Sequence, residues 1–172
     1  VRIQATRAVG SIASPEAIEP LARCIREDGY PECNPPYDEY EFNPCWEVQS
    51  SAVEALGQID DPAAAHVLIE LLTDDAFVDL LETGYRALAR IDDDLAKRHL
   101  MDSLVQGSEG RRRCAARAVS TLAATSASAE LTSALLQACE DGDPVVRVHA
   151  ASLLSTLNTA DAARPLCNML LD

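Results

Sequence analysis

Two cysteines, Cys33 and Cys45, could carry the most specific chemistry in this sequence, because they lie outside the helical pattern that holds the other four. Eleven residues separate them, so a disulfide could close the segment between them. A zinc site at the same place would need about four ligands, and only His66 and carboxylates could complete the set. The sequence contains no CxxC pair. A disulfide and free thiols therefore stay open as alternatives, and a zinc site is not predicted.

The other four cysteines are expected to be small buried hydrophobic residues, because they fall in helical segments rich in alanine and leucine. They are Cys24, Cys114, Cys139 and Cys167. This usage fits a reduced, cytoplasmic setting better than a secreted disulfide scaffold. No apolar run is long enough for a transmembrane helix, so no membrane association is predicted. Since the chain begins at Val1 within an expected helix, we expect it to be a piece of a longer array.

The three histidines do not form a recognisable catalytic pattern. His66, His99 and His149 lie in three different helical repeats. The sequence has no Ser/His/Asp order, glycine-rich phosphate loop or HExxH motif. We therefore predict no catalytic residue, no bound metal and no cofactor, and the sequence favours a non-catalytic protein over an enzyme.

Residues 27–47 are an insertion in which aromatic and acidic side chains gather. Four prolines and one glycine argue against a regular helix here. The aromatic residues are Tyr30, Tyr37, Tyr40, Phe42 and Trp46, and the acids closest to them are Asp38, Glu39 and Glu41. Disordered linkers are poor in aromatic residues, so a role is expected. Three readings stay open: packing over the gap between the first two repeats, contact with a partner, or chemistry at the cysteines.

The net charge of −14 is concentrated in one third of the chain. Residues 27–85 contain fifteen acids and no Lys or Arg. Such a surface suits a basic protein or peptide as partner. Nucleic acid is not expected, because one basic cluster, Arg111–Arg113 with Arg117, gives little phosphate attraction. These arginines could pair with Asp92–Asp94 or with another acidic surface nearby.

One pattern of apolar and small residues recurs along the chain and predicts paired helices. Its clearest copies are Val1, Ala5, Ala8, Val9, Gly10, Ile12; Val48, Ala52, Ala55, Leu56, Gly57, Ile59; and Val146, Ala150, Leu153, Leu154, Leu157. A second helix follows each copy, in two cases after Ser-Pro or Asp-Pro, which is a typical helix start. We expect five helix–turn–helix units near 1–26, 48–75, 80–106, 111–140 and 146–172. Helix pairs this short must stack to bury their apolar faces.

The motifs VRIQATRAVG with SPEAIEPL, VQSSAVEALGQIDDPAAAHVLIELL, and VVRVHAASLL with DAARPL resemble HEAT-like repeats. The short period, near 32 residues, is similar to the repeats of the phycobilin lyase family. The resemblance implies an all-α, right-handed α/α superhelix, a single solenoid over 1–172, in which the second helix of each pair lines the concave side. Aligned outward positions on these helices include Glu19, Arg23, His66, Glu70, Arg98 and Asp102. Their mixed charges fit either a solvated face with ion pairs between repeats or a partner-binding groove.

Together these observations predict a protein-interaction scaffold. The partner, a protein or peptide with a basic surface, would bind the 27–47 insertion and the concave face. The resemblance also implies an alternative, a bilin lyase or isomerase subunit that handles a tetrapyrrole and its client protein.

Overall fold

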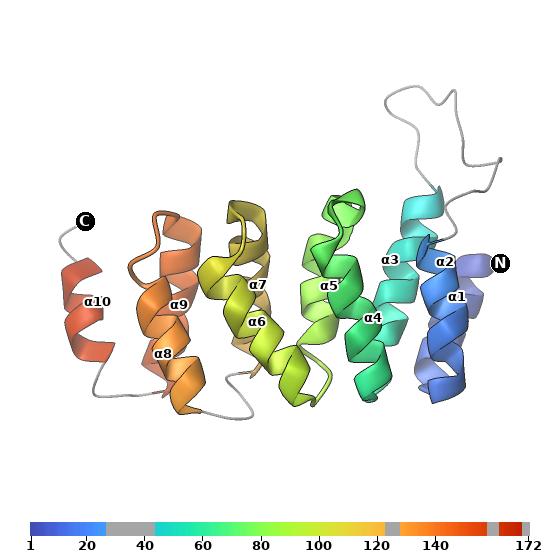
Figure 1. Cartoon of the computed structure of the whole chain (residues 1–172), viewed down its shortest axis with the longest axis horizontal. Coiled ribbons are helices and arrows are strands. Elements are labelled where there is room, and N and C mark those ends of the chain that lie inside the picture. Colours follow the sequence, from blue (N-terminus) through green and yellow to red (C-terminus); the bar gives the residue numbers. More distant parts are fainter. Residues whose placement is uncertain (27–43, 123–127, 158–161, 170–172) are drawn as a thin grey trace, which may run out of the picture. The chain divides into compact units, whose positions relative to one another are not determined.

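The computed structural model describes residues 1–26, 44–122, 128–157 and 162–169 (Figure 1). Every regular element of these stretches is helical, which confirms the predicted all-α class. The chain divides into two compact units, residues 1–93 and 94–172, and each is described by itself. The predicted third repeat, 80–106, spans this division, so the single solenoid over the whole chain stays a prediction.

The first unit consists of two layers of helices. Its elements are α1 (Arg2–Ile12), the 3-10 turn η1 (Pro15–Ala17), α2 (Ile18–Arg26), α3 (Pro44–Leu56), α4 (Pro62–Thr73), the 3-10 turn η3 (Asp75–Leu80) and α5 (Leu81–Leu88). Helices α1, α3 and α5 are neighbours in one layer, while α2 packs beside α4 in the other. This is the arrangement expected of stacked helix pairs.

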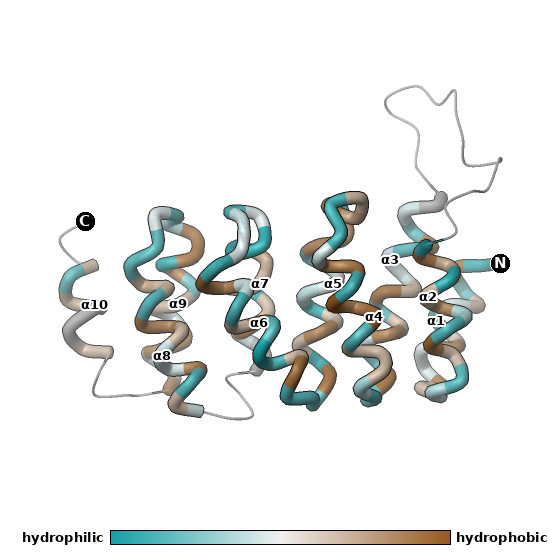
Figure 2. The backbone as a smooth tube through the Cα atoms, viewed as in Figure 1, coloured by the Kyte–Doolittle hydropathy of each residue, from teal (hydrophilic) through white to brown (hydrophobic). Residues whose placement is uncertain are grey.

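The second unit repeats the two-layer arrangement. It contains α6 (Asp94–Gln106), α7 (Glu109–Leu122), α8 (Ala129–Ala138), α9 (Pro144–Leu157) and α10 (Ala163–Met169). Helix α6 packs against α7 and α8, and α9 packs against α7 and α8. Hydrophobic and hydrophilic segments alternate along these helices (Figure 2), as expected for helices with one buried face.

Helix starts follow the polar residues that precede them. The Asp61 side chain accepts a hydrogen bond from the N–H of Ala63 at 2.8 Å, and Pro62 occupies the first helical position of α4. This confirms the predicted Asp-Pro start. At Ser14-Pro15 the chain forms the 3-10 turn η1 first, and α2 begins only at Ile18.

The predicted C-terminal boundary of the insertion, residue 47, is wrong, because α3 already begins at Pro44. Proline is tolerated in the first turn of a helix, where its missing N–H would have had no helical partner. Residues 44–47 therefore belong to α3 and not to a loop. The rest of the insertion, 27–43, lies outside the described residues.

The repeat motif forms the core in every described copy except the first. Val48, Ala52, Ala55 and Ile59 are buried. The equivalent positions of α1 are exposed, including Ile12 at 73%. Gly10 of the same copy is buried, and it lies close to Ala55 of α3.

Two motif glycines set the spacing between successive helices of the first layer. A Cβ added at Gly10 would lie 2.8 Å from the Cβ of Ala55, and one at Gly57 would lie 2.7 Å from the Cα of Ala87. Neither glycine has a positive φ. Close helix approach, rather than a turn conformation, therefore explains the small residue at this position.

Contacts at one-repeat separation fix the register of the first unit. Arg86 Nη2 lies 3.0 Å from Glu54 Oε1, and the backbone N–H of Asp92 donates to Asp60 Oδ1 at 3.1 Å. Each pair is 32 residues apart, which is the period inferred from the motif.

Candidate protein-binding site

The six helical residues predicted to contact a partner are all exposed. They are Glu19 and Arg23 on α2, His66 and Glu70 on α4, and Arg98 and Asp102 on α6. The first four belong to the first unit and the last two to the second. The predicted residues are therefore divided between the two units, and the surface of each unit is described by itself.

An ion pair joins the two second-layer helices of the first unit. Arg26 Nη2 at the end of α2 lies 2.6 Å from Glu70 Oε2 on α4, with both side chains exposed. The expected ion pairing between repeats is present here. Exposed pairs of this kind contribute about 0–1 kcal/mol, so the contact matters more for local charge than for stability.

A groove lies between α2, α4 and η3, and we call it the α2–α4 groove. Its lining residues are Ala22, Ile25, Arg26, Val67, Glu70, Leu71, Asp74 and Phe77, and its volume is about 350 Å³. Ala22, Ile25 and Leu71 are buried, so the floor is apolar. The backbone carbonyl of Ile25 accepts a hydrogen bond of 3.0 Å from the buried Gln49 side chain, which holds the end of α2 against α3.

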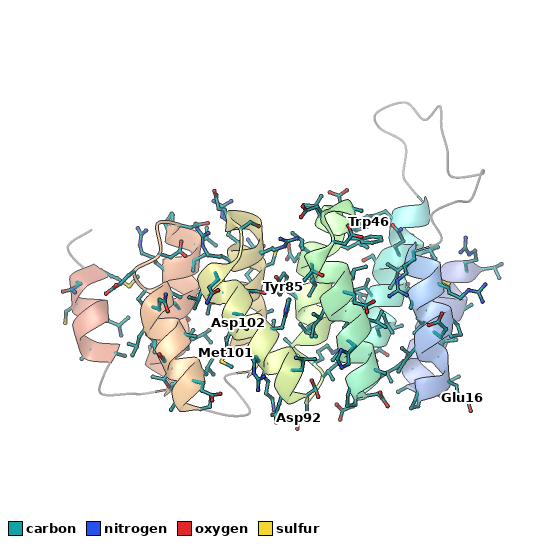
Figure 3. The ribbon with its side chains drawn as sticks, in the orientation of Figure 1. Glu16, Trp46, Tyr85, Asp92, Met101 and Asp102 are labelled. Carbon is teal, nitrogen blue, oxygen red and sulfur yellow. The ribbon has the colours of Figure 1, made fainter. Side chains whose placement is uncertain are left out.

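A second groove lies between α6 and α8 in the other unit. It has a volume of about 570 Å³ and is lined by Arg98, Met101, Asp102, Val105, Gln106, Ala129, Glu130, Ser133, Ala134 and Gln137. Figure 3 labels Met101 and Asp102, which both lie on α6. Two predicted residues, Arg98 and Asp102, therefore lie at a groove, as Glu70 does in the first unit. Glu19, Arg23 and His66 line neither groove.

Most predicted contacts of the insertion lie outside the described residues. This applies to Tyr30, Tyr37, Tyr40 and Phe42, to Asp38, Glu39 and Glu41, and to Cys33. The exception is Trp46 in the first turn of α3, whose side chain is 43% exposed (Figure 3). An indole combines an apolar ring system with one polar N–H, and such side chains are enriched at protein interfaces.

Two arginines of the basic cluster pair with the α8–α9 turn and not with residues 92–94. Arg112 Nε and Nη2 donate to Asp141 at 2.7 and 3.2 Å, while Arg112 Nη1 donates to the carbonyl of Gly107. Arg113 pairs with Asp143 and, at 2.6 Å, with Glu109. The sequence left two acidic partners open, Asp92–Asp94 or another acidic surface nearby. For Arg112 and Arg113 the second is correct, and it consists of Asp141 and Asp143.

The turn that receives these arginines was missed from the sequence, although Asp143-Pro144 repeats the Asp61-Pro62 pattern. Asp143 also starts α9, because its Oδ1 accepts the N–H of Val145 at 2.9 Å. Burial raises the pKa of Asp143, but the Val145 N–H and the Arg113 guanidinium outweigh it, so its pKa is lowered overall. Arg147 reaches back to the carbonyl of Asp141 at 2.9 Å.

The histidines remain distributed as the sequence predicted. His66 is exposed, and His149 is half-buried on α9. Burial lowers the pKa of His99, Asp102 opposes this, and Arg111 lowers it further, so the neutral ring is favoured. No group of three or more metal-ligating side chains occurs in the part of the chain that the structure describes. The same residues contain no helix long and apolar enough to cross a membrane.

Comparison with known families agrees with this architecture. The family model for HEAT repeats matches residues 39–120. The family model for the PBS lyase HEAT-like repeat matches residues 1–27. No curated protein matches the chain. The matched segments contain the first copies of the repeat motif and the helices α1 to α6, and the chain belongs to the HEAT-like repeat proteins.

Proposed function

We propose that this chain is a non-catalytic scaffold that binds a partner protein through α2, α4 and α6, together with residues 27–43 and the adjoining first turn of α3. The observation that carries the proposal is the exposure of all six predicted helical residues, three of which line grooves. Grooves with apolar floors and polar rims are typical of binding sites. HEAT-like repeats serve many tasks, so the support comes from these surfaces rather than from the fold.

The charge of the first unit supports a partner with a basic surface. Residues 47–85 contain no Lys or Arg, and two acids of this stretch, Glu70 and Asp74, line the α2–α4 groove. A negative surface speeds the approach of a positively charged partner and disfavours an acidic one. Binding should accordingly weaken as the salt concentration rises.

Replacing Tyr37, Tyr40 and Trp46 together by alanine is expected to lower partner capture at least about tenfold, because large aromatic side chains dominate interface energies. Capture from a lysate of the source organism, quantified by mass spectrometry, measures the effect. Helical circular dichroism should stay unchanged. The matched control is Ile12→Ala with Val148→Ala, two exposed hydrophobic residues far from the insertion in sequence. Equal capture by the aromatic variant and the control would rule out the insertion as a contact site.

A second function is favoured by the match of residues 1–27 to the PBS lyase HEAT-like repeat. In that case the chain would be a bilin lyase or isomerase subunit that holds a tetrapyrrole. Adding phycocyanobilin to the purified chain should then shift and sharpen the visible absorption of the pigment, because a bound bilin is held in one conformation. Serum albumin at equal concentration is the control for unspecific uptake. A spectrum identical to that of the free pigment would exclude this function.

A further inference from the structure

The α2–α4 groove has a shape that suits one large apolar side chain. Its floor is made by Ala22, Ile25 and Leu71, all buried, and Phe77 lies half-buried among the residues that line it. A volume of about 350 Å³ falls at the lower end of the range for ligand pockets. The groove therefore has room for a single leucine-sized or aromatic group with its adjoining backbone.

The polar residues that line the groove determine what could flank such a group. Glu70 and Asp74 are carboxylates, and Arg26 is the one basic residue among the lining side chains. Arg26 is held by Glu70 at 2.6 Å, in a pair whose members are both exposed. Since exposed ion pairs are weak, a partner's arginine could exchange with Arg26 at little cost.

Asp74 is fixed at the groove in a position to accept a further hydrogen bond. Its Oδ1 accepts the N–H of Ala76 at 2.9 Å, which starts η3. A carboxylate has about four acceptor positions, so this cap leaves capacity for an incoming donor. A guanidinium or ammonium group would make a charge-assisted bond there.

We propose that the α2–α4 groove binds a segment of the partner protein in which one large aliphatic or aromatic side chain is flanked by arginines or lysines. The apolar floor of the groove would take the central side chain, and Glu70 and Asp74 would take the flanking charges. This inference rests on the proposed scaffold function and assigns part of it to a defined place. The acidic stretch alone would attract any cation; the apolar floor supplies the requirement for a central hydrophobic group.

The test uses three fluorescein-labelled peptides and fluorescence polarisation with the whole chain. In the first peptide phenylalanine is flanked on each side by two arginines. The second has serine in place of phenylalanine, and the third has glutamates in place of the arginines. The first peptide should bind at least about tenfold more tightly than either of the others, which corresponds to one apolar anchor or one set of charge contacts. Equal binding of the first two peptides would overturn the inference.

Two groove variants and one matched control locate the site. Glu70→Lys reverses a charge at the groove, and Val67→Trp fills it without adding charge. Asp79→Lys makes the same charge change at an exposed position that does not line the groove. We expect each groove variant to weaken the first peptide at least about tenfold and Asp79→Lys to weaken it less than about threefold. An effect of Asp79→Lys as large as that of Glu70→Lys would show unspecific attraction and overturn the groove assignment.

Thermal unfolding by circular dichroism shows whether each variant is folded. If Glu70→Lys is not folded, Glu70→Gln takes its place. The scaffold proposal is tested separately, by measuring partner capture with the variant in which Tyr37, Tyr40 and Trp46 are replaced by alanine. If Val67→Trp still captures the partner as well as the unchanged chain does, the groove inference fails while the scaffold function stands. If the peptides discriminate as expected but no partner protein is captured, the groove binds as inferred and the scaffold function fails.

Discussion

Replacing Gly57 by alanine should lower the free energy of unfolding by about 1–3 kcal/mol, the usual cost of overpacking a close contact. The new Cβ would lie 2.7 Å from both the Cα and the Cβ of Ala87 and 2.8 Å from its carbonyl oxygen. The Cα and the carbonyl oxygen are backbone atoms of α5, and the Cβ is the methyl group of Ala87. No flexible side chain at this place can therefore move aside. Alanine would also restrict the unfolded chain, which favours folding by about 0.4–1 kcal/mol. The steric cost is the larger of the two, because relieving it requires α3 and α5 to separate.

Gly110→Ala is the matched control for this substitution. Gly110 lies in the first turn of α7, and a Cβ there would meet nothing within 4 Å. Its replacement should be neutral or stabilising by up to about 1 kcal/mol, through helix propensity. Urea unfolding followed by circular dichroism measures both variants. A Gly57→Ala chain as stable as the Gly110→Ala chain would show that α3 and α5 are not packed as closely as described.

The repeat could be predicted from the sequence because its signal is local and recurs. Alanine and glycine at fixed offsets, as in Ala52, Ala55 and Gly57, indicate one closely packed helix face wherever they occur. Residues at the same place in successive repeats meet in the structure, as Glu54 and Arg86 do 32 residues apart. The helix start at Asp61-Pro62 was equally visible, since the capping side chain and the proline are adjacent in sequence.

What could not be predicted depends on residues that meet only in the folded chain. Arg112 lies closer in sequence to Asp92–Asp94 than to Asp141, yet it binds the turn 29 residues further on, because α7 packs against α9. The α2–α4 groove arises from the way α2, α4 and η3 meet, and its floor includes Ile25, which the repeat pattern marks only as a core residue. Pro44 was interpreted as excluding a helix when it begins one.

Replacing Asp141 by alanine should cost about 2–3 kcal/mol of unfolding free energy, near the value for hydrogen bonds to charged groups. Asp141 accepts two bonds from Arg112, and its Oδ1 also accepts the N–H of Asp143 at 2.8 Å. The two side chains are only 24% and 10% exposed, so water replaces little of what is lost. Without the carboxylate, a largely desolvated guanidinium would keep its hydrogen bond to the carbonyl of Gly107 but lose both bonds to Asp141.

A double-mutant cycle separates the ion pair from the turn. With Arg112→Ala, Asp141→Ala and the double variant, we expect a coupling free energy of about 1–2 kcal/mol. The matched cycle is Arg86→Ala with Glu54→Ala, a pair at 3.0 Å whose side chains are 54% and 44% exposed and which should couple by less than about 1 kcal/mol. Asp141→Asn keeps an acceptor for the Asp143 N–H but loses the charge, so it should fall between the unchanged chain and Asp141→Ala. Equal coupling in the two cycles would mean that burial adds nothing to the strength of the Arg112–Asp141 pair.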